Sequence, residues 1–258
     1  GQGARTLFNN VDLSDILQGV TVEASVNALD VTTHQDSDHN RIAGLRDGTV
    51  SFDGLYDGTA LSTASTGTTG ALDARFATAL GSTTQPIITF GPEGDTRGRR
   101  CRMFTAEQTG YTASAMTDDV VKVSAAAAIS GRQDYGVWLH ARAARTSTAA
   151  TFGNVDSVDA GTTGGGVGHF HMTADTTITS FIGKIQHSSA ATTGSTDSWA
   201  DLITFTDSDE STGTAAVQRT TVAGTIKRRT RYIISTFTGG ASKSATVAVT
   251  FARRSPIL

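Results

Sequence analysis

Several residues of this sequence have the types and spacing that chemistry requires, and Cys101 is the first of them. It is the single cysteine of the chain, and it stands among Arg99, Arg100 and Arg102. Nearby cations lower the pKa of a thiol and make it a better nucleophile. Because no pattern near it marks a partner base, we expect a small apolar strand residue here and not a catalytic thiol.

A polar segment near residue 40 imitates the start of a calcium-binding loop. Asp36, Asp38 and Asn40 have the alternate spacing of the first ligands of such a loop. However, Arg41 stands where the loop requires glycine, and Asp47 stands where a bidentate glutamate is expected. No helical pattern flanks the segment, so we predict no metal site.

A pair of histidines could also bind a metal. His169 and His171 are two residues apart and therefore share one face of a strand. Phe170 and Met172 occupy the other face and would point into a core. We interpret the two histidines as the polar face of a half-exposed strand, without metal.

The remaining candidates for chemistry are aromatic or glycine-rich. Trp138 and Trp199 could be platforms for sugars, although single tryptophans in β-sandwiches more often belong to the core. The segment Gly91–Asp95 (GPEGD) lacks the lysine that a phosphate loop needs. The sequence also has no Gly-x-Ser-x-Gly motif. We therefore predict no enzyme, no cofactor and no metal.

The composition indicates an all-β protein. Charged residues make up 17% of the chain, against about 25% in an ordinary globular protein, while threonine, serine, alanine and 28 glycines are abundant. The net charge of −3 argues against a chain-wide nucleic-acid binder. A single cysteine excludes disulfides within the chain. With no apolar run of roughly 18 residues and no signal-peptide pattern, we expect a soluble protein folded in a reducing compartment.

Two alternating strands surround a polar segment in the N-terminal half. Residues 20–28 (VTVEASVNA) alternate strictly, as a half-buried strand does, and a second strand fits 49–56. The apolar parity switches at Leu29 and Val31, which predicts a bulge or the end of the strand. The polar stretch Thr32–Asn40 lacks proline and glycine, and we expect it to start a long exposed loop that runs to about Asp47. Long structureless loops in compact domains are usually functional or interaction arms.

The rest of the chain adds one helix and many short strands. Leu72, Phe76, Ala79 and Leu80 recur at helical spacing, and Gly81 ends the helix. Further strands fit residues 86–90, 99–105, 120–128, 137–141, 168–174, 178–187, 202–205, 216–222, 230–236 and 245–251. A Thr/Ala/Gly-rich stretch suggests a domain boundary near residue 150. This division gives an N-terminal domain over 1–150 and a C-terminal Ig-like β-sandwich over 151–258.

Charge is distributed unevenly along the chain. Residues 1–60 carry nine carboxylates and three arginines, a local net of −6. Basic groups cluster instead over Arg97–Arg102, Lys227–Arg231 and Arg253–Arg254. Patches of opposite sign on one chain suit head-to-tail self-association.

The order of motifs in the N-terminal half resembles the major tail tube protein of long-tailed, non-contractile bacteriophages. The resemblance rests on Val11–Asp15 (VDLSD), the alternating strand, Leu29–Thr33 (LDVTT), Ile42–Gly48 (IAGLRDG) and Val50–Gly54 (VSFDG). Later stretches resemble the C-terminal sandwich that some members add: Thr163–Gly168, Lys184–Ser188, Trp199–Thr206 and Val249–Arg253. The resemblance spans nearly the whole chain, and only the order of its motifs is specific.

The resemblance implies a structural virion protein that is assembled in the host cytoplasm. Its copies would form stacked, hexameric rings, and these would build the tail tube that conducts DNA during ejection. Its partners would be its own copies, the tape measure and tail-end proteins, and double-stranded DNA that passes without specific binding. No membrane is implied, and weak glycan contacts of the C-terminal domain are a guess.

Physical reasoning is consistent with such a tube, because closing a sheet into a barrel removes its exposed edges. The polar faces of the two strands would line the channel, where a neutral-to-acidic surface avoids the phosphates of DNA. These predicted lumen residues are Thr21, Glu23, Ser25, Asn27, Thr49, Ser51 and Asp53. The loop would reach the next ring or a neighbouring subunit, where its acids could meet a basic cluster. Its predicted contact residues are His34, Asp36, Asp38, His39, Arg41, Arg46 and Asp47.

Two other classes remain open from the sequence. A capsid decoration protein shares the β composition and would form trimers or monomers instead of tubes. A pair of carbohydrate-binding modules would need an exposed aromatic platform, for which Trp199 beside a Ser/Thr-rich turn is the candidate.

Overall fold

A computed structural model describes residues 3–57, 72–115, 120–148, 152–156, 161–189, 198–207 and 216–254 of the 258-residue chain. The described residues are mostly strands, joined in one antiparallel sheet with the order β10-β9-β12-β7-β6-β5-β1-β2 and further strands beside this path. The all-β prediction is confirmed. The low-complexity stretch 62–70 (STASTGTTG), for which the sequence predicts a loop, lies outside the described residues.

The N-terminal half is built on four long antiparallel strands. They follow the order β3 (Leu17–Asp30), β4 (Arg41–Leu55), β7 (Lys122–Arg145) and β6 (Arg100–Ser114). The first part of β6, Arg102–Thr105, also pairs with β5 (Ile87–Gly91), and β5 pairs with β1 (Arg5–Phe8). The short β2 (Val11–Asp12) pairs with β1, so β5, β1 and β2 follow β6 in the order of the sheet.

The single described helix, α1 (Leu72–Ala79), packs on the apolar side of the four-stranded sheet. Leu72 and Phe76 are its buried residues, as their helical spacing predicts. The Phe76 ring centre lies 5.4 Å from that of Phe52 in β4 and 5.5 Å from that of Phe8 in β1. Gly81 follows the helix with a φ of +74°, the left-handed conformation that glycine adopts readily at helix ends.

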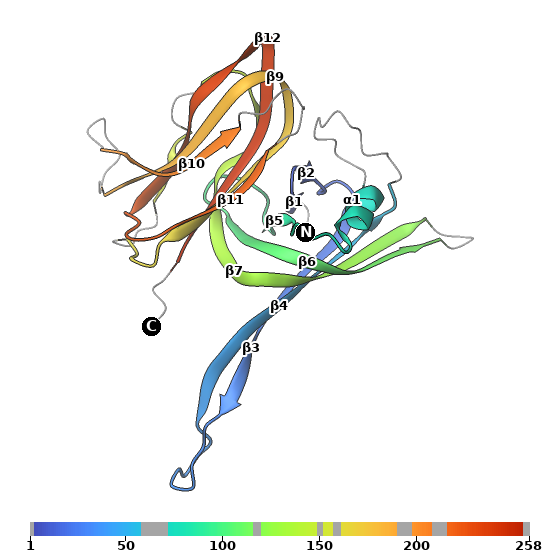
Figure 1. The fold of residues 1–258 in the computed structure, drawn as a ribbon, viewed down its shortest axis with the longest axis vertical. Helices are drawn as coiled ribbons and strands as arrows, with labels where there is room; N and C mark the ends of the chain where they lie inside the picture. Colours follow the sequence, from blue (N-terminus) through green and yellow to red (C-terminus); the bar gives the residue numbers. More distant parts are fainter. Residues whose placement is uncertain are drawn as a thin grey trace.

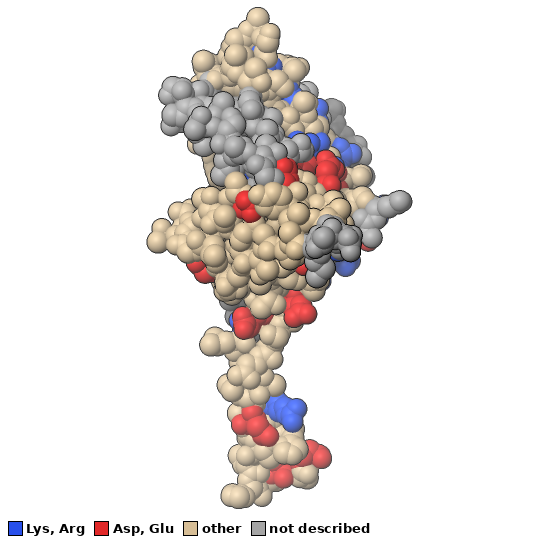
Figure 2. Space-filling view, turned by 90° about the vertical axis from the view of Figure 1, so that its right-hand side faces the viewer, with Lys and Arg blue, Asp and Glu red and all other residues tan. Residues whose placement is uncertain are grey.

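The predicted long loop over Thr32–Asp47 is wrong in its extent. Residues Arg41–Asp47 belong to β4, so β3 and β4 form a long hairpin whose turn occupies residues 31–40. The hairpin projects from the molecule as an arm (Figures 1 and 2). The pairing slips between Val26 and Ala28, where the ladder partners change from Arg46 to Ala43. Two steps along β3 match three along β4, so the bulge lies on β4, while β3 itself ends at Asp30, between the two residues of the parity switch.

The C-terminal half is centred on two strands of more than twenty residues, β9 (Gly166–Ser188) and β12 (Arg229–Arg253). β10 (Ala200–Asp207) and β11 (Val217–Val222) pair with β9, and β8 (Asn154–Asp156) pairs with β12. Several strands that the sequence separates are therefore continuous. The predicted segments 168–174 and 178–187 merge in β9, 230–236 and 245–251 merge in β12, and 120–128 and 137–141 merge in β7.

The two halves share backbone pairing and packing. β12 pairs with β7 over Ala245–Phe251, so one sheet includes strands from both sides of the predicted boundary. A small buried cluster also joins them, with Met103 and Trp138 from one half and Val167 and Ala248 from the other. The division into two domains at residue 150 stays a prediction beside these shared contacts.

Candidate assembly surface

The predicted lumen residues lie on one face of the four-stranded sheet. In the β3–β4 ladder, Thr21 stands opposite Ser51 and Glu23 opposite Thr49, and cross-strand partners point to the same side. The third predicted position, Ser25, stands opposite Asp47. All of these side chains are exposed except Ser51, which is half-buried.

Two further strands continue this polar face. Thr49, Ser51 and Asp53 of β4 stand opposite Ala128, Ala126 and Ser124 of β7, which are small residues. These in turn face residues of β6, where Thr112 is the partner of Ser124. The face therefore carries small or acidic side chains over four strands, with Lys122 at one end.

The other face of the same strands is a hydrophobic core. Val50 and Phe52 of β4 and Val123 and Ala125 of β7 are all buried there, next to Phe76 of α1. The alternation read from the sequence is thus realised as one side packed and one side in water. A sheet buried on one side only can line a channel with its other side.

Both outer edges of the four-stranded sheet lack a partner strand within the described residues. β3 pairs with β4 alone. The C-terminal part of β6, after Ala106, pairs with β7 alone. Open edges expose backbone donors and acceptors that can pair with another chain. Because β3 and β6 run in opposite directions, an edge of one copy can join the edge of another in the same antiparallel pattern.

The arm exposes large apolar side chains. Leu45 is 87% exposed, Ile42 is 52% exposed, and Val26, Leu29 and Val31 are each at least 40% exposed. Ile42 and Leu29 are cross-strand partners and form one small patch. An isolated two-stranded hairpin is at best marginally stable in water, so an arm of this kind gains from being covered.

The turn of the arm is held by its own polar groups. Asp30 accepts hydrogen bonds from the Thr32 hydroxyl and backbone N–H, and these bonds hold its pKa below the usual range. Asp36 accepts bonds from the backbone N–H of Thr33 (2.7 Å) and from its hydroxyl (3.0 Å), which lower the pKa of Asp36 in the same way. His39 contacts Asp30 at 3.0 Å. The turn is therefore a folded, ionised element.

The structure places the predicted contact residues in two groups. His34, Asp36, Asp38 and His39 lie in the turn, whereas Arg41, Arg46 and Asp47 lie on β4. Their role between subunits stays a prediction, as does the role of the lumen residues. Asn27 lies at the register shift between Val26 and Ala28, where the regular pairing of the lumen residues ends.

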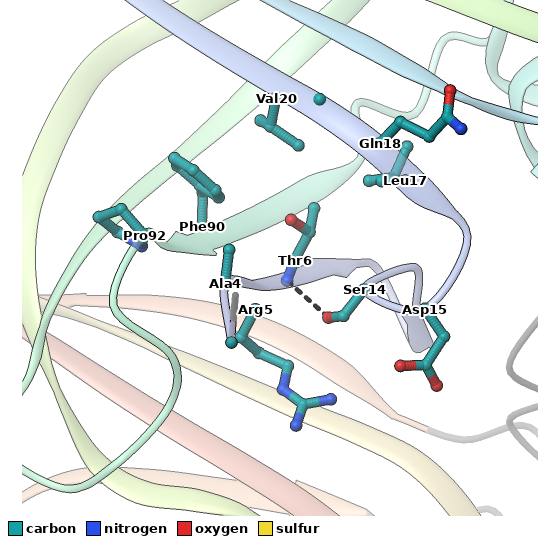
Figure 3. A pocket seen from close by; sticks show the side chains of 12 residues that line it. Ala4, Arg5, Thr6, Ser14, Asp15, Leu17, Gln18, Val20, Phe90 and Pro92 are labelled. Carbon is teal, nitrogen blue, oxygen red and sulfur yellow. Dashed lines mark hydrogen bonds between the residues drawn. The ribbon is translucent and has the colours of Figure 1, made fainter. Parts of the chain in front are cut away.

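A groove of about 480 Å³ opens beside the first residues of β3 (Figure 3). Leu17, Val20, Phe90 and Pro92 give it apolar walls, with Arg5 and Asp15 at its rim. The backbone N–H of Thr6 donates to Ser14 Oγ at 2.9 Å and fixes one side. Sequence reasoning missed this groove because its walls come from three separate segments with no shared motif.

Burial explains the outcome for Cys101. Its side chain is 2% exposed, and burial raises the pKa of the thiol. The prediction of an apolar strand residue is confirmed. Among the described residues, no group of three or more His, Cys, Asp and Glu side chains is arranged to hold a metal ion.

The interpretation of His169 and His171 as a half-exposed polar face is wrong. Both are fully buried, because that face of β9 packs against β5 and the β1–β2 turn. Thr89 Oγ1 lies 3.0 Å from His169 Nδ1 and 2.8 Å from His171 Nε2. His171 Nδ1 donates to the carbonyl of Asn9 at 2.6 Å, and Arg219 Nε donates to His169 Nε2 at 3.2 Å.

These contacts form one chain of hydrogen bonds in which each donor has one acceptor, provided that both imidazoles are neutral. Burial lowers the pKa of His171 to about 4. Burial, together with the neighbouring His171 and Arg219, holds the pKa of His169 well below its usual value. Asp134, which is 2% exposed, adds a buried ion cluster nearby, with Arg254 at 2.7 Å and Arg219 at 3.0 Å.

The two tryptophans have different surroundings. Trp138 is fully buried in the cluster between the halves, which confirms the core interpretation. Trp199 is half-buried, and the guanidinium of Arg231 lies 4.1 Å from the centre of its ring. Arg231 also donates to Gln186 at 2.9 Å, so this aromatic face is already in contact with a side chain of the protein.

Within the described residues, no helix is long and apolar enough to cross a membrane. No protein-family model and no curated protein matches the sequence. Among solved structures, the chain is similar to a component of the virion of a native gene transfer agent particle. That match has 13% identity and a TM-score of 0.41, and it covers 52% of this chain and 96% of the other.

Two further structures come from SPP1. Its tail tube matches at 11% identity with a TM-score of 0.39, over 51% of this chain and 75% of the other. Its Dit protein, described as a hub adsorption apparatus, matches at 12% identity with a TM-score of 0.38, over 97% and 99%. At these identities and TM-scores, none of the three assigns a function to this chain.

Proposed function

We propose that this chain is the structural subunit of a bacteriophage tail tube. Copies join edge to edge through β3 and β6 into a closed, hexameric ring, and rings stack through the arm into a tube that conducts DNA. The observation that carries the proposal is the four-stranded sheet with a polar face, an apolar face and two open edges of compatible direction.

Ring closure would satisfy the backbone groups that the monomer leaves open. Every internal pairing of the four strands is antiparallel, so joining β3 of one copy to β6 of the next repeats the same pattern around the ring. Closure removes both edges at once, which an isolated monomer cannot do.

The channel surface would be suited to the passage of DNA. The polar face carries Glu23, Asp47 and Asp53 among serines, threonines and alanines. Lysine and arginine provide most contacts to phosphates. Arg46 lies on the opposite side from Asp47, and Lys122 stands at one end of the polar face. A duplex would therefore slide without specific binding.

Microscopy tests the proposal directly. Purified protein at high concentration, imaged by negative stain, should show rings and tubes. Uniform monomers or trimers at all concentrations would contradict the tube and would favour a decoration protein.

Cross-linking tests the ring contact. Thr21→Cys on β3 is combined in turn with Glu107→Cys, Gly110→Cys and Thr112→Cys, three positions on the same face of β6. Oxidation should give covalent multimers for at least one pair, while the buried Cys101 stays unreactive. The matched control, Thr21→Cys with Ser124→Cys on the central strand β7, should give none. Rings without any β3–β6 link would show that the edges are not the contact.

A further inference from the structure

A basic pocket lies where the two halves of the chain meet, and the proposed function does not use it. Its volume is about 430 Å³, and its lining includes Arg97 from the loop before β6, His140 and Arg145 of β7, and Phe152 and Gly153 ahead of β8. We propose that this pocket binds a phosphate group, either as the free ion or carried on a small molecule. The inference is independent of the tube, because the site lies within a single chain.

The charged groups that line this pocket all have the same sign. Arg97 and Arg145 stay protonated at any ordinary pH, and none of the described lining residues is aspartate or glutamate. Arg97 donates to the carbonyl of Phe152, and Arg145 Nε donates to His140 Nε2 at 2.9 Å. Both contacts are to neutral groups, and each uses one of the five N–H donors of a guanidinium. The positive charge is therefore not compensated within the pocket.

The two arginines come from separate segments and gather around one pair of rings. Burial, followed by the nearby charges of Arg145 and Arg97, lowers the pKa of His140 to about 4. The ring centre of Phe152 lies 4.5 Å from that of His140 and 4.4 Å from the guanidinium carbon of Arg145. A charge shifts the pKa of a neighbour strongly only at short range, so both cations lie close to the same imidazole.

His140 also provides a buried donor that lacks an acceptor. The residue is 3% exposed. Because arginine can only donate, Nε2 accepts from Arg145, and the proton of the neutral ring is on Nδ1. The carbonyls of Val247 and Ala141 raise the pKa of His140, but neither completes a hydrogen bond to Nδ1, which has no partner within the described residues. A buried donor without an acceptor costs free energy, which an oxygen of a ligand would recover.

Gly153 leaves the room that Arg97 occupies. Its φ of +77° lies in the left-handed region, and a Cβ atom there would lie 2.5 Å from Nη1 of Arg97. The guanidinium therefore packs directly over the backbone, and its bond to the Phe152 carbonyl holds it in place. A guanidinium that is held in this way is preorganised, because its planar fork matches two oxygens of a phosphate.

The chemistry of the pocket selects the class of ligand. Two guanidinium groups and one imidazole N–H are all donors, which suits an oxyanion and opposes a cation. The volume of about 430 Å³ falls within the range of small-molecule pockets, roughly 300–1,000 Å³. A free phosphate ion and a small phosphate monoester both fit this space.

Calorimetric titration of the full chain with inorganic phosphate tests the site, with sodium chloride holding the ionic strength constant. We expect saturable binding at one site per chain, weakened at least tenfold in Arg97→Gln and in Arg145→Gln. The matched control is Arg99→Gln, which removes an exposed arginine of the same loop that pairs with Glu93 at 2.8 Å. This variant should bind phosphate as the wild type does.

A second titration, with glycerol 3-phosphate, distinguishes the two sources of the phosphate group. Tighter binding than that of inorganic phosphate would support a ligand that carries the group on a small molecule. Equal or weaker binding would support the free ion.

Arg97→Gln keeps the test valid if the other variant fails to fold. Arg97 is exposed, so its replacement should leave the thermal midpoint without phosphate unchanged, whereas Arg145 is half-buried. If Arg145→Gln is unfolded by circular dichroism, the comparison of Arg97→Gln with Arg99→Gln decides.

Three results would overturn the site. These are the absence of saturable binding to the wild type at millimolar phosphate, equal affinities of the wild type and Arg97→Gln, and a heat that chloride alone reproduces. Protein that binds phosphate as expected but forms neither rings nor tubes would contradict only the proposed function.

Discussion

The two ends of one hairpin behave differently, although the same two strands build both. Near the body, Val50 and Phe52 are 1% exposed and pack against α1, whereas Leu45 and Ile42 on the arm are 87% and 52% exposed. The same kind of residue thus stabilises the monomer at one end and is exposed to water at the other. Exposed apolar side chains on a folded strand are therefore where we expect an assembly contact.

The largest expected loss of stability comes from a substitution in the body, in the core beneath the hairpin. Phe52→Ala removes a ring that contacts Phe8 and Phe76, with ring centres 6.3 Å and 5.4 Å away. We expect the free energy of unfolding to fall by about 3–5 kcal/mol, measured by chemical denaturation of the monomer. A loss below about 1 kcal/mol would mean that this core does not hold the sheet together.

The second largest loss of stability is expected at the buried ion cluster between the two halves. Asp134→Asn keeps the shape of the side chain but leaves Arg219 and Arg254 beside a neutral amide. We expect a loss on the order of 3 kcal/mol, because removing one partner of a buried ion cluster leaves charge uncompensated. Arg100→Gln, a change of an exposed arginine, serves as the control and should leave the denaturation midpoint unchanged.

Acid should weaken the packing between the two halves by protonating the buried His171. The pKa of His171 is about 4 in the folded protein, against an ordinary value of 6.5, so the unfolded chain binds a proton that the folded chain rejects. The stability that this difference in pKa contributes is complete above pH 6.5 and is lost as the pH falls toward 4. His171 alone accounts for up to about 3 kcal/mol.

Thermal denaturation between pH 7 and pH 4 measures this effect. His171→Gln should flatten the decline with acid, while His34→Gln, a change in the exposed turn of the arm, should leave it as in the wild type. An unchanged slope in His171→Gln would show that the acid sensitivity arises elsewhere.

The smallest effect on the monomer is expected on the arm, with a large effect on assembly. Ile42→Ser with Leu45→Ser should change the unfolding free energy by no more than about 0.5 kcal/mol, since both side chains are exposed. Tubes should be lost and rings kept, as seen by sedimentation and negative stain. A variant that loses stability but still forms tubes would reverse the comparison between body and arm.

Local patterns in the sequence predicted much of the N-terminal half. Strict alternation over residues 20–28 gave the strand and its two faces, because side chains of a strand alternate with a period of two. The spacing of Leu72 and Phe76, with Gly81 behind them, gave the helix and its buried side. The break in parity at Leu29 and Val31 coincides with the end of β3 at Asp30.

The tertiary structure decided the rest, because those features depend on which segments meet. Residues 32–47 show no strict alternation, so only the ladder with β3 shows that β4 begins at Arg41. The alternation around His169 and His171 is the same for an exposed face and for one that a second layer covers. Packing against β5 buries them.

The groove illustrates the same limit, since Thr6, Val20 and Phe90 become neighbours only after three strands are arranged in space. The sequence alone determined the class and the faces of single elements such as β3, because these follow from the periodicity of neighbouring residues. The open edges, the exposed arm and the buried contact between the halves depend on long-range pairing, which no local pattern encodes.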